Sequence, residues 1–158
     1  MSIEKVKDYL NNFGLLDRVL EFDVSSATVE LAALAVGTNP EKIAKSLTFM
    51  LDEKPIIIVC AGDVKIDNSK FKQQFQTKAK MIAFDDVERF VGHKVGGVCP
   101  FAIKDSVDVY LDNSLKRFDI VYPACGSSNS AIGLTIDELE MTAQNFVSFV
   151  DVCKKIEI

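Results

Sequence analysis

The sequence is poor in the residues that build metal sites. Its 158 residues include no tryptophan, a single histidine, His93, and four scattered cysteines that form no CxxC pair. A structural zinc site needs four Cys or His ligands at short spacings, so we expect no metal. Cys60 and Cys153 end apolar runs, where a free cysteine usually behaves as a small core residue. Reduced thiols of this kind fit a cytoplasmic protein.

Long apolar segments are also missing. No run reaches the roughly 18–20 apolar residues that cross a bilayer. The first five residues, MSIEK, carry mixed charge and lack the apolar stretch of a secretory signal. We therefore expect a cytoplasmic protein with no membrane partner. With 48% apolar and 26% charged residues, a chain of this length fits a single domain over residues 1–158.

The charge is unevenly distributed. A formal net charge of −5 argues against wholesale wrapping of nucleic acid, because phosphate contacts need clustered Lys and Arg. Residues 42–104, however, contain eleven Lys and Arg against seven acids, a net of +4, while the rest of the chain carries −9. This basic middle permits one local contact with an anionic partner, although a solvated helix face has a similar composition.

Short helices and short strands alternate without a regular βαβ period. Apolar spacing and capping residues predict helices over residues 3–13, 29–35, 41–45, 68–75, 86–91 and after Thr135. Apolar or alternating runs predict strands over residues 19–22, 47–51, 56–60, 107–112, 120–122 and 131–134, with residues 146–153 as strand or helix. The strands 47–51 and 56–60 should form a hairpin. The pattern predicts a mixed α/β fold with a sheet curled around one core.

Lys45 is the first candidate functional residue. It lies in the apolar segment IAKSL, residues 43–47, where the predicted short helix gives way to a core strand. A lysine in such a place either extends its ammonium to solvent or points into a cleft with its charge compensated. The residue pattern leaves both interpretations open.

The segment GHKVGGVCPF, residues 92–101, is the second candidate. It contains three glycines and a proline, and glycine permits positive φ and close approach of the backbone to a ligand. Successive N–H groups of such a loop can bind an anion or a developing oxyanion, although a tight structural turn has the same composition. The segment matches neither a Walker loop nor a GxGxxG fingerprint. A second loop, residues 124–131, is rich in small polar residues and could line a polar pocket or form a turn.

Familiar catalytic sets are absent from the sequence. There is no GxSxG nucleophile elbow, and any triad would have to use His93. Cys99, next to Pro100, is a possible nucleophile with His93 as its base. We favour an inert, small Cys99 and a His93 that anchors the loop by a hydrogen bond.

Several segments together resemble the YbaK-like, prolyl-tRNA-synthetase-associated editing domains. They occur in the family's order between about residue 20 and residue 140: TVE at 28–30, AVG at 35–37, IAKSL at 43–47, AGD at 61–63, GHKVGGVCPF at 92–101 and SAI at 130–132. The hallmarks are the lysine, here Lys45, and a GxxxP loop, here Gly96–Pro100.

The resemblance implies a single-domain mixed α/β fold with a curled, barrel-like sheet and surrounding short helices. It implies a trans-editing deacylase that hydrolyses the ester joining an amino acid to the terminal adenosine of tRNA, typically a mischarged tRNA for proline. No metal or organic cofactor is implied. The implied partners are the tRNA acceptor end and, as a second candidate, prolyl-tRNA synthetase.

The resemblance also assigns site residues. In relatives the lysine corresponding to Lys45 is needed for activity, and the loop corresponding to Gly96–Pro100 borders the aminoacyl pocket. We predict that Lys45 fixes the charged 3′ end or the substrate carbonyl and that the amides of Gly96, Gly97 and Val98 stabilise the oxyanion. The residues expected to border the substrate are Thr28, His93, Cys99, Pro100, Gly126, Ser128, Asn129 and Ser130.

Two departures from the family pattern leave the amino acid open. Several YbaK-like proteins carry an aspartate near the position of Ala131, and residues 127–130 differ from the Gly-Gly-Lys type of some relatives. Cysteine is therefore not assigned, and alanine, serine or another small amino acid is equally compatible. Two other functions also fit: a non-catalytic module of the same fold that binds a tRNA end or a synthetase, and a small-molecule ester hydrolase.

Overall fold

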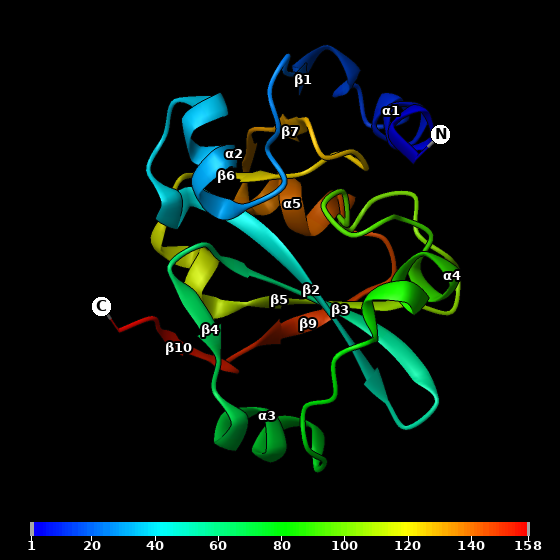
Figure 1. Ribbon diagram of the computed structural model, residues 1–158, viewed down its shortest axis with the longest axis vertical. Helices are drawn as coiled ribbons and strands as arrows, with labels where there is room; N and C mark the ends of the chain where they lie inside the picture. Colours follow the sequence, from blue (N-terminus) through cyan, green and yellow to red (C-terminus); the bar gives the residue numbers. More distant parts are fainter. Residues whose placement is uncertain (1, 158) are drawn as a thin grey trace.

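A computed structural model describes residues 2–157, which form five α-helices and ten strands (Figure 1). The helices are α1 Ser2–Asn11, α2 Val29–Val36, α3 Asn68–Phe75, α4 Val87–Val91 and α5 Ile136–Thr142. The strands are β1 Val19–Glu21, β2 Ile43–Leu51, β3 Lys54–Ala61, β4 Val64–Ile66, β5 Asp108–Asp112, β6 Ile120–Pro123, β7 Ser130–Ile132, β8 Leu134–Thr135, β9 Phe146–Val150 and β10 Cys153–Lys155. Short 3-10 turns lie at Leu16–Arg18, Pro40–Lys42, Phe84–Asp86 and Asn113–Arg117. None of the helices in this part of the chain is long and apolar enough to span a bilayer.

Six strands form one mixed sheet in the order β8-β6-β2-β3-β5-β9. The hairpin β2–β3 is antiparallel and forms its long middle, which crosses the molecule diagonally in Figure 1. β6 joins β2 in parallel, whereas β5 joins β3 and β9 joins β5, also in parallel. Two small antiparallel pairs, β1–β7 and β4–β10, complete the curled arrangement. The predicted mixed α/β class with a curled sheet is confirmed.

β3 is the centre of the hydrophobic core. Its residues 56–61, IIIVCA, are fully shielded from solvent, because β2 and β5 flank the strand and side chains cover both faces of the sheet. A continuous apolar run is what such a two-sided environment selects. The core extends under α1 through Val6 and Leu10 and under α3 through Phe71. The buried strand β3 therefore fixes the positions of its neighbours β2 and β5 in the sheet.

Local capping chemistry fixes several helix ends as predicted. The Thr28 hydroxyl accepts a hydrogen bond from the Leu31 amide at 3.2 Å and begins α2, and Gly37 ends it with φ of +85°. Thr135 and Glu138 form a reciprocal capping box at the start of α5. These caps satisfy backbone groups that would otherwise be unpaired at helix ends.

The structure corrects three predicted elements. Residues 41–45 are not a helix: a 3-10 turn ends at Lys42, and β2 begins at Ile43 because its backbone pairs with both β3 and β6. The run 131–134 is two strands rather than one, since β7 pairs with β1 and β8 pairs with β6. Asp85 provides no side-chain cap to α4, which follows a 3-10 turn.

Candidate functional site

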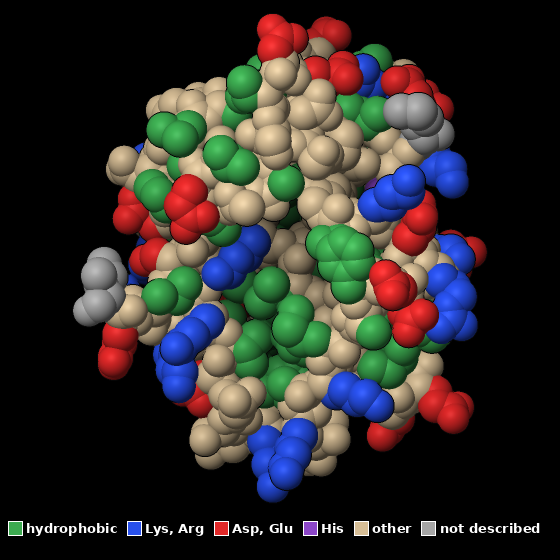
Figure 2. All heavy atoms as spheres, in the orientation of Figure 1, with side chains coloured by type: hydrophobic (Ala, Val, Ile, Leu, Met, Phe, Trp, Pro, Cys, Tyr) green, Lys and Arg blue, Asp and Glu red, His purple; other side chains and the backbone are tan. Residues whose placement is uncertain are grey.

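A cavity of about 490 Å³ opens beside the first half of β2. Its walls come from residues 26–32, β2, residues 81–87, residues 95–98 and the segment around Ser130. The volume lies in the range of small-molecule sites. Figure 2 shows a hollow with apolar side chains inside and Lys and Arg side chains around it. Among the described residues that line this cavity, Lys45 is the one with a charged side chain.

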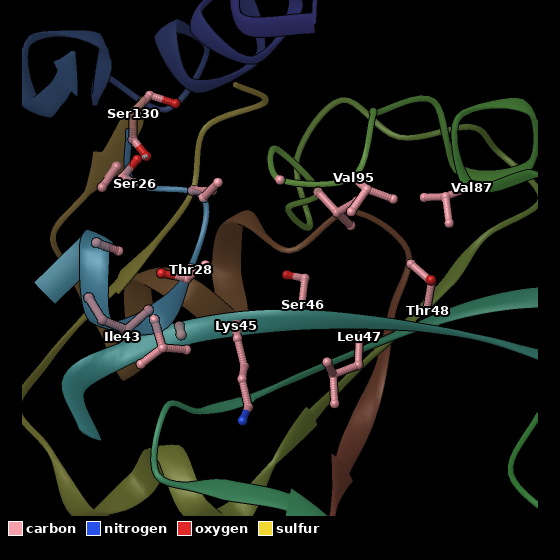
Figure 3. A pocket seen from close by; sticks show the side chains of 18 of the residues that line it. Ser26, Thr28, Ile43, Lys45, Ser46, Leu47, Thr48, Val87, Val95 and Ser130 are labelled. Atoms are coloured by element: carbon pink, nitrogen blue, oxygen red, sulfur yellow. Dashed lines mark hydrogen bonds between the residues drawn. The ribbon is translucent and has the colours of Figure 1, made fainter. Parts of the chain in front are cut away.

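β2 presents its side chains alternately to the two faces of the sheet. In Figure 3, Ser46 points toward Val95 and Thr28, whereas Lys45 and Leu47 leave the strand on the opposite side. This alternation follows from the two-residue period of an extended strand. The predicted helix at 41–45 would have placed Lys45 differently, so the pairing of β2 determines where its side chain goes.

The Lys45 ammonium is compensated rather than exposed to open solvent. Its Nζ donates a hydrogen bond to the carbonyl oxygen of Val64 in β4, and the side chain is half-buried. Lys45 and the loop residues Gly96 and Val98 line the same cavity, but the ammonium is directed away from Val95. The predicted convergence of the ammonium with the loop amides therefore requires Lys45 to leave Val64 and rotate about its flexible stem.

One of the three amides predicted as donors in the glycine loop, residues 92–101, is already used within the loop. The Gly97 amide donates to the Lys94 carbonyl at 3.0 Å and closes a turn. The amides of Gly96 and Val98 make no hydrogen bond within residues 2–157, and both residues line the cavity. A tetrahedral oxyanion needs donors of this kind, so Gly96 and Val98 are the better candidates.

Gly97 has a packing role. A Cβ atom at this position would lie 2.7 Å from the backbone of Gly126 and Ser127, so only glycine lets the two loops approach this closely. Gly96 differs because its φ of +96° is a conformation that side chains disfavour, although a Cβ there would meet ordinary contacts. The two neighbouring glycines are thus required for different physical reasons.

His93 and Cys99 lie beneath the loop and are fully buried. The Phe101 carbonyl can only accept, so His93 Nε2 donates to it at 2.7 Å and cannot act as a base toward Cys99, 3.5 Å away. Burial raises the pKa of the Cys99 thiol to about 12 and lowers the pKa of His93. Neither residue lines the cavity among the described residues. The geometry therefore favours the anchoring role of His93 and an inert Cys99.

The serine loop, residues 124–131, uses several of its polar groups in hydrogen bonds to other parts of the protein. The Asn129 amide side chain donates to the Phe22 carbonyl at 3.0 Å, and the Ser128 carbonyl accepts from the Ser26 amide at 2.6 Å. These bonds hold residues 22–26, which lead into the cavity wall. Ser130 itself lines the cavity, and its hydroxyl contacts that of Ser127 at 2.7 Å.

The structure thus divides the predicted site residues into two groups. Those that line the cavity are Thr28, Lys45, Gly96, Val98 and Ser130. Those that support the loops without lining it, among the described residues, are His93, Gly97, Cys99, Pro100, Gly126, Ser128 and Asn129. Within residues 2–157, no three His, Cys, Asp or Glu side chains cluster as a metal site would require.

Sequence reasoning missed several lining residues. Ser46 and Thr48 were missed because the start of β2 was taken as a helix, although alternation from Ala44 to Thr48 could have revealed them. Met81 and Phe84 fall in a stretch with no predicted element. The signal that could have identified them is the apolar run over residues 81–84, which lies outside every predicted helix and strand.

The residues that line this cavity lie in a segment that is similar to known proteins. The family profile described as the aminoacyl-tRNA editing domain matches residues 24–141, a range that contains every residue lining the cavity. An uncharacterized protein of Bacillus subtilis (strain 168), YwhH, is 48% identical and covers 99% of this chain and 100% of the relative. A proline–tRNA ligase of Geobacillus sp. (strain WCH70) is 28% identical over 64% of this chain, which corresponds to 18% of the ligase.

The fold is also similar to that of a solved structure. A protein described as a candidate trans-editing enzyme for prolyl tRNA synthetase superposes with a TM-score of 0.86 at 25% sequence identity, with 97% of each chain covered.

Proposed function

Because the chain belongs to the aminoacyl-tRNA editing domain family, we propose that it is a trans-editing deacylase that hydrolyses the ester of a mischarged tRNA. The observation that carries this proposal is the cavity, which Gly96, Val98 and Lys45 line and whose walls are largely apolar and free of acidic residues. The amides of Gly96 and Val98 have no hydrogen-bond partner among the described residues. Such a site can hold an acyl group and stabilise negative charge that develops on it.

The reaction needs only water as the second reactant. Water adds to the ester carbonyl carbon, and the carbonyl oxygen becomes an oxyanion that the amides of Gly96 and Val98 can bind. The tetrahedral species then breaks its bond to the ribose oxygen, which takes the proton that the attacking water gives up, and the free amino acid is released. Rigid placement of the two amides by Gly97 and His93 means that no reorganisation is required at this step.

Lys45 supplies the positive charge. In this proposal its ammonium exchanges the Val64 carbonyl for the terminal phosphate or the ester carbonyl of the bound acceptor end. In the protein without substrate, the Val64 carbonyl accepts a hydrogen bond from the Lys45 ammonium, which limits the free-energy cost of partly burying this charge. A cation that orients substrate in this way raises the rate without transferring a proton.

The tRNA for proline is the proposed substrate, because relatives named as proline–tRNA ligases share this domain. The cavity is largely apolar with hydroxyl groups in its walls, which is compatible with a side chain such as that of alanine or serine. Prolyl-tRNA synthetase is a further proposed partner for the same reason. The competing function, a binding module without catalysis, predicts the same partners but no ester cleavage.

The test is a panel of alanyl-, cysteinyl- and seryl-tRNA for proline, assayed for release of the amino acid. We expect the wild type to cleave at least one, and Lys45→Ala to lower kcat/KM by about 10²–10³-fold. Lys42→Ala is the matched control, because Lys42 precedes β2 and does not line the cavity. Binding of charged tRNA without cleavage by the wild type would support the non-catalytic module instead.

A further inference from the structure

The mouth of the cavity is bordered by large apolar side chains that remain open to solvent. Phe84 is 73% exposed, Met81 60% and Val95 45%, and all three line the cavity. Exposed aromatic and aliphatic groups gathered at one opening are unusual on a protein surface and indicate a binding role. We propose that Phe84, with Met81 beside it, stacks on the adenine base of the terminal adenosine while the aminoacyl group occupies the cavity.

The segment that carries these side chains is held firmly against β2. The Met50 amide donates to the Lys80 carbonyl at 2.9 Å, and the Ile82 amide donates to the Thr48 carbonyl at 3.1 Å. These bonds extend the sheet by one short bridge between Phe49 and Met81. The exposed rim is therefore fixed to the same strand as Lys45, and its distance from the reacting centre is set by the sheet.

Covalent connectivity locates the base at this rim. The proposal rests on the proposed function, in which the acyl group is bound beside Gly96 and Val98. The ribose is joined to that acyl group, so it must lie at the mouth, and the base attached to the ribose lies one sugar further out. A flat, neutral base needs an apolar surface there, and base–aromatic stacking provides it.

Charge around the rim distinguishes a base from a phosphate. Asp85 and Asp86 directly follow Phe84, and Arg89 offsets the charge of Asp86 at 3.0 Å. Asp85 has no ion pair among the described residues, so its negative charge disfavours phosphate on this side of the mouth. The exposed lysines Lys78 and Lys80 precede Met81 in the chain and can contact the phosphate backbone of the tRNA 3′ end. The rim thus suits a neutral ring at Phe84 with phosphates directed away from the aspartates.

The absence of tryptophan from the chain makes a direct test possible. The Phe84→Trp protein has one tryptophan, at the rim, and we expect adenosine 5′-monophosphate to quench its fluorescence by stacking. Ribose 5-phosphate, which lacks the base, should not. Val147→Trp is the matched control, since Val147 is exposed on β9 and does not line the cavity. Equal quenching of both variants, equal quenching by both ligands, or none at millimolar nucleotide would overturn the proposal.

Kinetics provide the second readout. Phe84→Ala should raise KM for the mischarged tRNA roughly tenfold, which is within the range for loss of one base–aromatic stack, and leave kcat nearly unchanged. Phe84→Tyr should restore KM, and Phe84→Ala should raise KM less for an amino acid ethyl ester, which has no base, than for the mischarged tRNA. An unchanged KM for tRNA would contradict stacking. Because the fluorescence assay needs no catalysis, quenching in a protein without deacylase activity would refute the proposed function and leave the stacking site intact.

Discussion

His93 donates a hydrogen bond from Nε2 to the carbonyl oxygen of Phe101 over 2.7 Å, and this bond ties the start of the glycine loop to its end. The other ring nitrogen, Nδ1, is buried and has no partner among the described residues. A protonated imidazole would carry an uncompensated charge at this place, so the neutral ring is favoured. The loop that presents the Gly96 and Val98 amides thus depends on an uncharged histidine.

This arrangement predicts a pH dependence of stability. Burial lowers the pKa of His93 below its ordinary value of 6.5, so the unfolded chain binds the proton first as pH falls. The stabilisation is complete above pH 6.5 and is lost progressively as pH falls below it toward the folded pKa, by about 1.4 kcal/mol per unit of separation. Urea unfolding between pH 7.5 and 5.5 measures the loss. His93→Gln can still donate to Phe101 and does not titrate, so its stability should be flatter over this range; an equal slope in both proteins would exclude His93 as the cause.

The contact between Gly97 and the Gly126–Ser127 backbone yields a second prediction. Gly97→Ala places a Cβ 2.7 Å from backbone atoms that cannot move aside, and we expect the free energy of unfolding to fall by about 1–3 kcal/mol. The neighbouring amides of Gly96 and Val98 shift with the loop, so kcat for deacylation should fall as well.

Gly37→Ala is the control for this variant. Unlike Gly97, Gly37 has a positive φ, +85°, but a Cβ there meets nothing within 4 Å, and the residue does not line the cavity. Chemical denaturation should show only the cost of a left-handed alanine, about 1–2 kcal/mol, with kcat unchanged. If Gly97→Ala kept wild-type kcat, the loop would not be the rigid oxyanion element proposed here.

Much of this architecture is predictable from local sequence signals. The caps at Thr28 and Thr135 are predictable because each depends on a side chain three residues from the amide that it accepts from. The continuous apolar run over residues 56–60 likewise predicts a buried central strand. The sequence alone indicates the candidate lysine and the glycine loop, and Lys45, Gly96 and Val98 line the cavity.

The remaining features depend on contacts between distant residues. Capping residues and apolar spacing predict a helix over residues 41–45, but the pairing of Ile43 with Tyr122 and of Lys45 with Cys60 makes the segment a strand from Ile43 onward. Which loop amides are available, and which are used by a turn, also depends on tertiary geometry, as Gly97 illustrates. Residue type and spacing alone predict neither the strand pairing nor which loop amides are already hydrogen-bonded.

The ion pair between Arg18 and Glu138 provides a third prediction, this time in acid. Two hydrogen bonds, at 2.6 and 2.9 Å, together with the Thr135 amide, lower the pKa of the Glu138 carboxyl from 4.5 to about 2. The carboxylate therefore stabilises the fold above pH 4.5, and that contribution is lost as pH falls toward 2. Glu138→Gln keeps an acceptor for Thr135 but cannot titrate. The difference in stability between the two proteins should shrink from pH 5 to pH 2, and a constant difference would show that the pair contributes nothing.

Ser46 provides the last prediction, because its hydroxyl is buried, lines the cavity and has no hydrogen-bond partner within residues 2–157. An unsatisfied buried hydroxyl costs free energy, so Ser46→Ala should leave the free energy of unfolding unchanged or raise it. Ser130→Ala is the matched control: the Ser130 hydroxyl bonds Ser127 at 2.7 Å and the Cys125 amide at 3.3 Å, and its removal should cost about 1–3 kcal/mol.

In Figure 3 the Ser46 side chain rises from β2 on the side of Thr28 and Val95, and we expect a polar group of the substrate to be the partner that its hydroxyl lacks. If the amino-acid side chain supplies that group, Ser46→Ala should lower kcat/KM for seryl-tRNA relative to alanyl-tRNA by roughly 5–150-fold, the equivalent of about 1–3 kcal/mol. Competition between the two substrates in one reaction measures this ratio directly. An unchanged ratio, together with unchanged stability, would mean that the Ser46 hydroxyl contacts neither the protein nor the amino acid, and that selectivity is set by the apolar walls around it.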